Sequence, residues 1–272
     1  MSDLFWLIEF VKGVNRPNDA KKLLIPRWPE KSDFTGMRFA SAFTKRITMI
    51  QRSVPVVLIP AKNEEASVGE VVRQVLSELY CEVVVIDDVS TDRTIQAAKS
   101  AGATVLPLAV HLGAWGAIQT GLRYALKTGY RVAVTMDADG QHQPSSVLSL
   151  IAPIETREAD VVIGACVKRG SRARHLAWMM FRRLSGVGLE DLTSGFRAYN
   201  QKAMTLLASR KATLLDYQDL GVLILLRRVG LHVVEKQVEM CPRISGASRI
   251  FNSWWVVVRY MLASSILCLA KR

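Results

Sequence analysis

The stretch VPVVLIPAKNE at positions 54–64 decides the fold, because an apolar, β-branched run ends there abruptly in polar residues. Two later stretches repeat the design, EVVVIDDVSTD at 82–92 and YRVAVTMDADGQH at 130–142. Runs that are apolar throughout are typical of strands buried on both faces of a parallel sheet. Ligands of such sheets bind beyond the carboxyl ends of the strands. The three polar clusters are therefore predicted to converge on one edge of the sheet.

Strand-like and helical segments alternate along residues 54–165. The predicted strands are 54–60, 82–88, 103–108, 130–137 and 160–165. The predicted helices are 65–79, 91–101, 114–128 and 144–157. This alternation predicts an α/β fold with a Rossmann-like, mostly parallel sheet and helices on both faces. Neither GxGxxG nor GxxxxGK[ST] follows the first strand, which disfavours hydride transfer with a dinucleotide and nucleoside triphosphate hydrolysis.

The composition is that of a globular protein. The 272 residues are 50% hydrophobic and 22% charged, which excludes a disordered or collagen-like chain. The four cysteines have neither CxxC nor metal-ligand spacing, so they predict core residues in a reducing compartment. The formal net charge is +12, and 161–189 holds six basic residues and no acidic one. Such basic stretches favour phosphate groups, whether of nucleic acid, a nucleotide or an anionic membrane.

The two ends of the chain are predicted to be helical additions to the central fold. Residues 1–52 contain ten basic residues and no strand pattern, and they lack the start of a secretory signal. From 250 to 270 only Arg259 is charged, although no uncharged run reaches the roughly 18 residues of a membrane span. A helix that is apolar all round must be covered by protein or lipid. Its cover is therefore the core, a second copy of the chain, or a membrane surface.

The cluster DDVSTD follows the second predicted strand. Its hydroxyls, Ser90 and Thr91, are predicted to cap the next helix. The two adjacent carboxylates, Asp87 and Asp88, are not needed for capping. One of them is predicted to bind a ribose diol or a base edge.

The cluster DADGQH follows the fourth predicted strand. In an extended chain, residues i and i+2 point to the same side, so Asp137 and Asp139 are predicted to face one cation. Carboxylate oxygens suit Mg²⁺ or Mn²⁺ and leave positions for phosphate oxygens. A metal so held would neutralise charge on a departing diphosphate.

Five segments together resemble family 2 glycosyltransferases with the GT-A fold. They are IPAKNEE, VVVIDDVSTDRT, GAIQTGLRYAL, MDADGQHQP and DLTSGFRAYN, in this order. The similarity is greatest to polyprenol-phosphate (dolichol-phosphate-like) mannosyl- and glucosyltransferases and to bacterial envelope-polysaccharide enzymes. It divides the chain into an N-terminal extension (1–52), a GT-A domain (53–250) and an apolar C-terminal helix (251–272).

The resemblance implies a role for each matching residue. The nucleotide-sugar donor would contact Pro60, Ala61, Glu64, Val85, Asp87, Asp137, Ala138, Arg243 and Arg249. The metal, Mg²⁺ or Mn²⁺, would be held by Asp139, Gln141 and Asp137. The acceptor side would be shaped by Ser194, Gly195, Phe196 and Arg197. The chain departs from its relatives at Lys62, where many have an aromatic residue, and at Cys166, where an arginine is common.

The implied reaction is an inverting sugar transfer to a polyprenyl phosphate or a lipid-linked saccharide. A lipid phosphate is already a nucleophilic anion, whereas a sugar hydroxyl needs a carboxylate base, for which Asp191 and Asp219 are the candidates. Peripheral contact with the cytoplasmic face of the cell membrane would follow, or a cytoplasmic location if the C-terminal helix packs on the core. A non-catalytic nucleotide-sugar binder or membrane partner is the alternative. A nucleic-acid partner is disfavoured because no recognised binding module is present.

Overall fold

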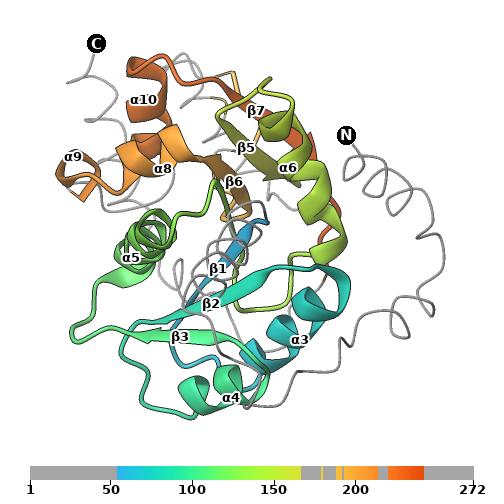
Figure 1. The fold of residues 1–272 in the computed structure, drawn as a ribbon, viewed down its shortest axis with the longest axis vertical. Coiled ribbons are helices and arrows are strands. Elements are labelled where there is room, and N and C mark those ends of the chain that lie inside the picture. The colour runs from blue at the N-terminus through green and yellow to red at the C-terminus, as the bar shows by residue number, and fades with distance from the viewer. Residues whose placement is uncertain (1–53, 167–178, 180–187, 192, 214–219, 242–272) are drawn as a thin grey trace, which may run out of the picture. The chain divides into compact units, whose positions relative to one another are not determined.

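Seven strands form one sheet in the part of the chain that the structure describes, which is residues 54–166, 179, 188–191, 193–213 and 220–241 of a computed structural model. The strands are β1 (Val56–Ala61), β2 (Glu82–Asp87), β3 (Thr104–Pro107), β4 (Val132–Thr135), β5 (Val161–Ala165), β6 (Arg197–Asn200) and β7 (Val233–Gln237). They lie in the order β3-β2-β1-β4-β6-β5-β7 (Figure 1). All neighbours are parallel except β6, which runs antiparallel to both β4 and β5.

Helices cover both faces of this sheet, as predicted. They are α3 (Val68–Glu78), α4 (Thr94–Ser100), α5 (Gly113–Thr128), the short 3₁₀ turn η2 (Pro144–Ser146), α6 (Val147–Glu155), α8 (Gln201–Leu207), α9 (Arg210–Thr213) and α10 (Leu220–Arg228). Helices α5, α8, α9 and α10 pack on one face, and α3, α4 and α6 on the other (Figure 1).

The alternation of side chains along each strand builds two cores. In β1, Val56 and Leu58 pack into the core beneath α5, whereas Val57 and Ile59 pack into the core beneath α3. All four side chains are fully buried. A strand of this kind needs apolar residues at every position, which is why the run in the sequence is uninterrupted.

The five strands and four helices predicted from the sequence are confirmed, most of them with shorter bounds, although β1 ends one residue later and α5 begins one residue earlier than predicted. Strands β6 and β7 were not predicted, because neither is an apolar run. β6 contains the fully buried Arg197. β7 lies at the edge of the sheet and carries Glu235 and Lys236. Because both strands contain polar residues, a search for continuous apolar runs does not find them.

Several predictions concern residues outside the described ones. The N-terminal extension 1–52 and the C-terminal helix 251–272 lie there, as does most of the basic stretch 161–189. Within the described ranges, no helix combines the length and apolar character that crossing a membrane requires.

Three side chains of α5 fasten it to α8 and α9. Trp115 Nε1 donates to the carbonyl of Ala212 at 2.9 Å, and Gln119 Nε2 donates to the carbonyl of Leu207 at 2.7 Å. Arg123 Nε donates to the carbonyl of Ala208 at 3.0 Å. The donors recur every four residues, so they lie on one face of the helix. They supply partners for carbonyls at and beyond the end of α8, which the helix itself cannot satisfy.

Replacing Gln119 with Met is expected to destabilise the protein. Met keeps a similar volume but cannot donate, so the buried carbonyl of Leu207 loses its partner. The free energy of unfolding should fall by about 1–3 kcal/mol, measured by urea denaturation. Thr120→Ala is the control, since the Thr120 hydroxyl donates within its own helix to Gly116, and its effect should stay within about 0.5 kcal/mol. Equal effects would contradict the assigned role of Gln119.

Candidate functional site

The loops after β1 and β2 are joined by hydrogen bonds at the carboxyl edge of the sheet. The amide of Asn63 donates to Ser90 Oγ at 2.8 Å, and the amide of Thr91 donates to Asn63 Oδ1 at 2.7 Å. The amide of Glu64 donates to Thr94 Oγ1 at 2.8 Å. The two clusters IPAKNE and DDVSTD therefore form one unit, as their convergence on one edge predicted.

The prediction that Ser90 or Thr91 caps the following helix is wrong. Helix α4 begins at Thr94, and the side chain that accepts from its first turn belongs to Asp92, whose Oδ1 accepts from the Thr94 amide at 3.0 Å. Ser90 and Thr91 instead bind Asn63 of the neighbouring loop. The sequence does not reveal this difference, because it depends on the loop after another strand.

The two adjacent carboxylates have separate roles. Asp88 Oδ1 accepts from the amide of Leu112 at 2.8 Å, and its Oδ2 accepts from the amide of Gly113 at 3.0 Å, so Asp88 caps the start of α5. Asp87 Oδ2 accepts from the amide of Ser90 at 3.1 Å. Its Oδ1 is buried and has no hydrogen-bond partner among the described residues. Of the pair, Asp87 is thus the one that offers an oxygen to a ligand.

The residue after this pair has a strained backbone. Val89 has φ of +59°, in the left-handed region that a β-branched residue rarely adopts. Strain of this kind costs of order 1–3 kcal/mol and is concentrated at functional sites. It supports the assignment of the β2 loop to the site.

The remaining residues predicted around the nucleotide occupy different environments. Pro60 and Ala61 end β1, beside Ile86 and Asp87 of β2. The Val85 side chain is fully buried in the core beneath α3, two residues before Asp87. Glu64 Oε2 accepts from Ser67 Oγ at 3.0 Å. The predicted residues Arg243 and Arg249 lie outside the described residues.

The DADGQ segment is a turn rather than a continuation of β4. The strand ends at Thr135, the chain turns at Ala138 and Asp139, and Gly140 has φ of +77°. The predicted extended alternation is therefore wrong, although the turn still groups the polar side chains. The amide of Gln141 donates to Asp139 Oδ1 at 3.0 Å.

The oxygen atoms of this turn differ in exposure. The Asp137 side chain is 42% exposed, whereas Asp139 and Ala138 are buried. Gln141 Oε1 is buried and has no hydrogen-bond partner among the described residues. Within those residues, no group of three or more His, Cys, Asp or Glu side chains is placed to hold a metal ion. The candidate metal ligands are therefore two carboxylates and one amide oxygen.

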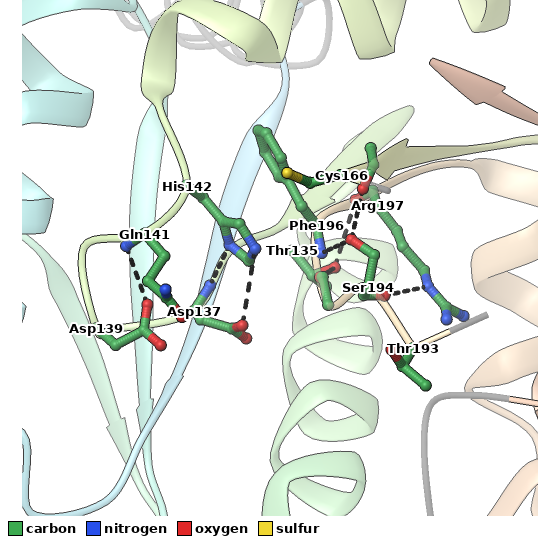
Figure 2. A network of polar contacts seen from close by, with 12 residues as sticks. Thr135, Asp137, Asp139, Gln141, His142, Cys166, Thr193, Ser194, Phe196 and Arg197 are labelled. Atoms are coloured by element: carbon green, nitrogen blue, oxygen red, sulfur yellow. Dashed lines mark hydrogen bonds and ion pairs between the residues drawn. The ribbon is translucent and has the colours of Figure 1, made fainter. Parts of the chain in front are cut away.

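His142 connects this turn to the SGFR segment, a role that the sequence analysis did not identify. Its Nδ1 accepts from the amide of Asp137 at 3.0 Å, and its Nε2 lies 3.7 Å from Asp137 Oδ2 (Figure 2). Its ring stacks on Phe196, with 4.8 Å between the ring centroids. The imidazole is almost fully buried. Its position directly behind DADGQ was the only signal in the sequence.

The SGFR segment lies directly beside Asp137. Gly195 is the contact point, because a Cβ atom built there would lie 2.7 Å from Asp137 Oδ1. Thr135 Oγ1 donates to the carbonyl of Gly195 at 2.7 Å, which ties the segment to the end of β4 (Figure 2). The predicted donor and acceptor sides are thus brought together at this glycine.

The other side chains of SGFR point into the protein. Ser194 Oγ donates to the carbonyl of Gly164 at 2.6 Å, and Arg197 Nε donates to the carbonyl of Ser194 at 2.8 Å (Figure 2). Phe196 and Arg197 are fully buried. These residues hold the backbone of the segment that the sequence analysis assigned to the acceptor side.

Asp191 is buried and holds the residues around it. Its Oδ1 accepts from both the amide and the hydroxyl of Thr193 at 3.1 Å, and its Oδ2 lies 3.5 Å from the amide nitrogen of Cys166. The other candidate base, Asp219, lies outside the described residues.

Comparisons with known proteins agree with this architecture. The family model Glycosyl transferase family 2 matches residues 56–210. The chain is 29% identical over 210 residues to an undecaprenyl-phosphate mannosyltransferase of Micrococcus luteus, covering 71% of this chain and 86% of that one. It is 26% identical over 182 residues to a UDP-N-acetylglucosamine–dolichyl-phosphate N-acetylglucosaminyltransferase of Methanococcus voltae, covering 56% and 72%.

The fold also matches a solved structure. It is glucosyl-3-phosphoglycerate synthase from Mycobacterium tuberculosis, in complex with Mn²⁺, uridine-diphosphate-glucose and phosphoglyceric acid. The TM-score is 0.60 at 24% identity, covering 82% of each chain. At this identity the likeness establishes the GT-A fold.

Replacing Gly195 with Ala is expected to displace the Asp137 carboxylate, since the new Cβ atom would lie 2.7 Å from its Oδ1. If Asp137 is a metal ligand, the affinity for Mn²⁺ in the presence of a nucleoside diphosphate should fall about 10- to 100-fold, measured by calorimetry. Gly188→Ala is the control, because no atom of the described residues lies within 4 Å of its Cβ position. Unchanged Mn²⁺ affinity in Gly195→Ala would remove Asp137 from the metal site.

Proposed function

We propose that this chain, a nucleotide-sugar-dependent glycosyltransferase that belongs to glycosyl transferase family 2, uses a polyprenyl phosphate as its acceptor. The proposed reaction inverts the configuration at the anomeric carbon of the transferred sugar. An oxygen of the acceptor phosphate attacks the anomeric carbon while the bond from that carbon to the diphosphate breaks. The electron pair leaves with the nucleoside diphosphate. The product is a polyprenyl phosphate sugar for cell-envelope glycan synthesis.

The observation that carries the donor assignment is the Asp87 carboxylate. It is 2% exposed, lies at the end of β2 and keeps Oδ1 without a hydrogen-bond partner among the described residues. An unpartnered buried oxygen is costly unless a ligand supplies a donor. A ribose hydroxyl or a base N–H would supply it. The donor site would be completed by Pro60 and Ala61 at the end of β1, Glu64 of the following loop, the segment at Val85, and Arg243 and Arg249.

The turn after β4 suits a divalent metal. Asp137, Asp139 and Gln141 offer hard oxygen donors, and the buried Gln141 Oε1 has no hydrogen-bond partner among the described residues. These donors fit Mg²⁺ or Mn²⁺. When bound, such an ion would neutralise negative charge on the leaving diphosphate. His142 holds the amide of Asp137, so the protein fixes this turn through its own contacts.

The acceptor assignment rests on relatives and on Asp191. Both named transferases act, by their names, on lipid phosphates. A phosphate monoester is anionic and needs no general base. The Asp191 carboxylate already accepts from Thr193, so its contacts hold the segment before β6, which we call the acceptor loop (190–191 and 193–195). Ser194, Gly195, Phe196 and Arg197 would shape that loop around the acceptor.

A lipid acceptor places the enzyme at a membrane surface. We propose peripheral binding to the cytoplasmic face of the cell membrane, through the basic stretch 161–189 and the apolar C-terminal helix 251–272. Each basic residue near an anionic surface adds about 1 kcal/mol of attraction. Failure of the whole protein to bind anionic liposomes at low salt would refute this part.

Binding of a nucleoside diphosphate is expected to be selective and metal-dependent. Calorimetric titration of UDP, GDP, CDP and dTDP should give one preferred ligand whose affinity rises with Mn²⁺. Asp139→Ala should abolish the effect of Mn²⁺. Glu70→Gln is the control, since Glu70 pairs with Arg73 on the outer surface of α3. Binding without sugar transfer to any acceptor would favour a non-catalytic nucleotide-sugar binder.

Asp191→Asn distinguishes the two classes of acceptor. With a polyprenyl phosphate, kcat should fall by less than about tenfold, because Asn still accepts from Thr193 and no base is lost. With a sugar hydroxyl as acceptor, loss of a general base would lower kcat by about 10²–10⁴. The two kcat values are measured from steady-state transfer to undecaprenyl phosphate and to a lipid-linked saccharide. A fall of the larger size with undecaprenyl phosphate would make Asp191 a catalytic residue.

A further inference from the structure

One side chain of the edge strand β7 binds two consecutive backbone amides of the acceptor loop. Glu235 Oε2 accepts from the amide of Glu190 at 2.7 Å, and its Oε1 accepts from the amide of Asp191 at 2.8 Å. A carboxylate that accepts two hydrogen bonds in this way fixes both peptide groups at once. β7 itself is anchored by parallel pairing with β5 over five residue pairs (Figure 1).

The contacts continue from Asp191 toward the site. Its carboxylate holds Thr193 and approaches the amide of Cys166, the residue after β5. Ser194 then donates to the carbonyl of Gly164. Gly195, next in the chain, lies against Asp137. The position of Gly195 therefore depends on a series of hydrogen bonds that begins at Glu235.

The charge of Glu235 is not explained by an ion pair. Within the described residues it forms none, and the carboxylates of Glu190 and Asp191 lie nearby. Burial raises the pKa of Glu235, the two amide hydrogen bonds lower it, and the two neighbouring carboxylates raise it again, so that the net shift is upward.

The direction of this shift has a consequence for stability. A carboxyl group whose pKa is raised by folding favours the folded state below its unfolded pKa, and that contribution is lost as the pH rises through the folded pKa. Ionised Glu235 therefore contributes less to the stability of the folded state than protonated Glu235 would. Its two hydrogen bonds to backbone amides indicate a role in positioning.

We propose that Glu235 is a positioning residue for the acceptor, which sets Gly195 against Asp137 by holding the amides of Glu190 and Asp191. This inference rests on the proposed transfer to a polyprenyl phosphate. Glu235 lies outside all five segments through which the sequence resembles family 2 glycosyltransferases. The part of the donor site that the loops after β1 and β2 form does not contact Glu235 in the described residues.

The variant Glu235→Gln tests the proposal, because it replaces one of the two accepting oxygens with an NH₂ donor, so that one of the two backbone amides no longer meets an acceptor. The value of kcat/KM for undecaprenyl phosphate should fall at least about tenfold. The Kd of the preferred nucleoside diphosphate, measured without Mn²⁺, should stay within about twofold, because the loops after β1 and β2 do not contact Glu235 in the described residues. Gln237→Ala is the matched control on the same strand, since its side chain donates only to the Glu190 carboxylate, at 3.3 Å. It should change neither constant by more than about twofold.

Hydrogen exchange provides a readout that does not require activity. The amides of Glu190 and Asp191 should be protected in the wild type and lose protection in Glu235→Gln. In the wild type alone, their protection factors should fall as the pH is lowered and Glu235 becomes protonated, so the test does not depend on the variant folding.

Three results would overturn the proposal. They are unchanged protection of both amides, an unchanged kcat/KM for the acceptor, and an equal loss of donor and acceptor binding, which would mean a general structural role. A wild-type enzyme that transfers sugar to no lipid phosphate would instead refute the proposed function. The exchange measurement would still decide whether Glu235 holds the loop.

Discussion

The antiparallel insertion of β6 between β4 and β5 is the constraint on which the site depends. The carboxyl ends of parallel strands share one edge of a sheet, and the amino end of an antiparallel strand lies at that same edge. The residues that precede β6 are therefore brought beside the turn that follows β4. The contact between Gly195 and Asp137 and the stacking of Phe196 on His142 are direct consequences. A parallel β6 would carry SGFR to the opposite edge.

The edge that holds the site is built largely from carboxylates that bind backbone amides. Asp88 accepts from the amides of Leu112 and Gly113, Asp92 from Thr94, and Glu235 from Glu190 and Asp191. Loops at a sheet edge leave amides without strand partners, and a charged acceptor satisfies them well. Asp87 differs, since one of its oxygens remains without a partner among the described residues. The acidic residues of one motif therefore differ in role. Asp88 binds backbone amides with both oxygens, whereas Asp87 keeps one oxygen available to a ligand.

Sequence reasoning identified the elements that follow a simple pattern. The apolar runs of β1, β2 and β4 and the polar clusters behind them were predicted because burial on both faces requires continuous apolar residues. The roles of Ser90 and Thr91 were not, because their partner Asn63 lies on another loop. Glu235 was missed for the same reason, since the amides of Glu190 and Asp191 that it binds belong to a distant segment. His142 binds the amide of Asp137 within its own turn, but its stacking on Phe196 of the SGFR segment leaves no local pattern.

The opposite edge of the sheet is held by contacts of a different kind, made mainly between regular elements. There, Glu82 accepts from the hydroxyls of Tyr124 and Thr104 at 2.9 Å, and it also accepts from the hydroxyl of Tyr130. Burial, together with the hydrogen bond and charge of Glu82, raises the pKa of Tyr124 to about 12, so the phenol remains a donor at neutral pH. These residues come from regular elements and the short connection before β4, and they join the amino ends of β2 and β3 to α5 and to that connection. At the carboxyl edge the corresponding contacts are made between loops, and side chains such as Glu235 hold the loop that would bind the acceptor.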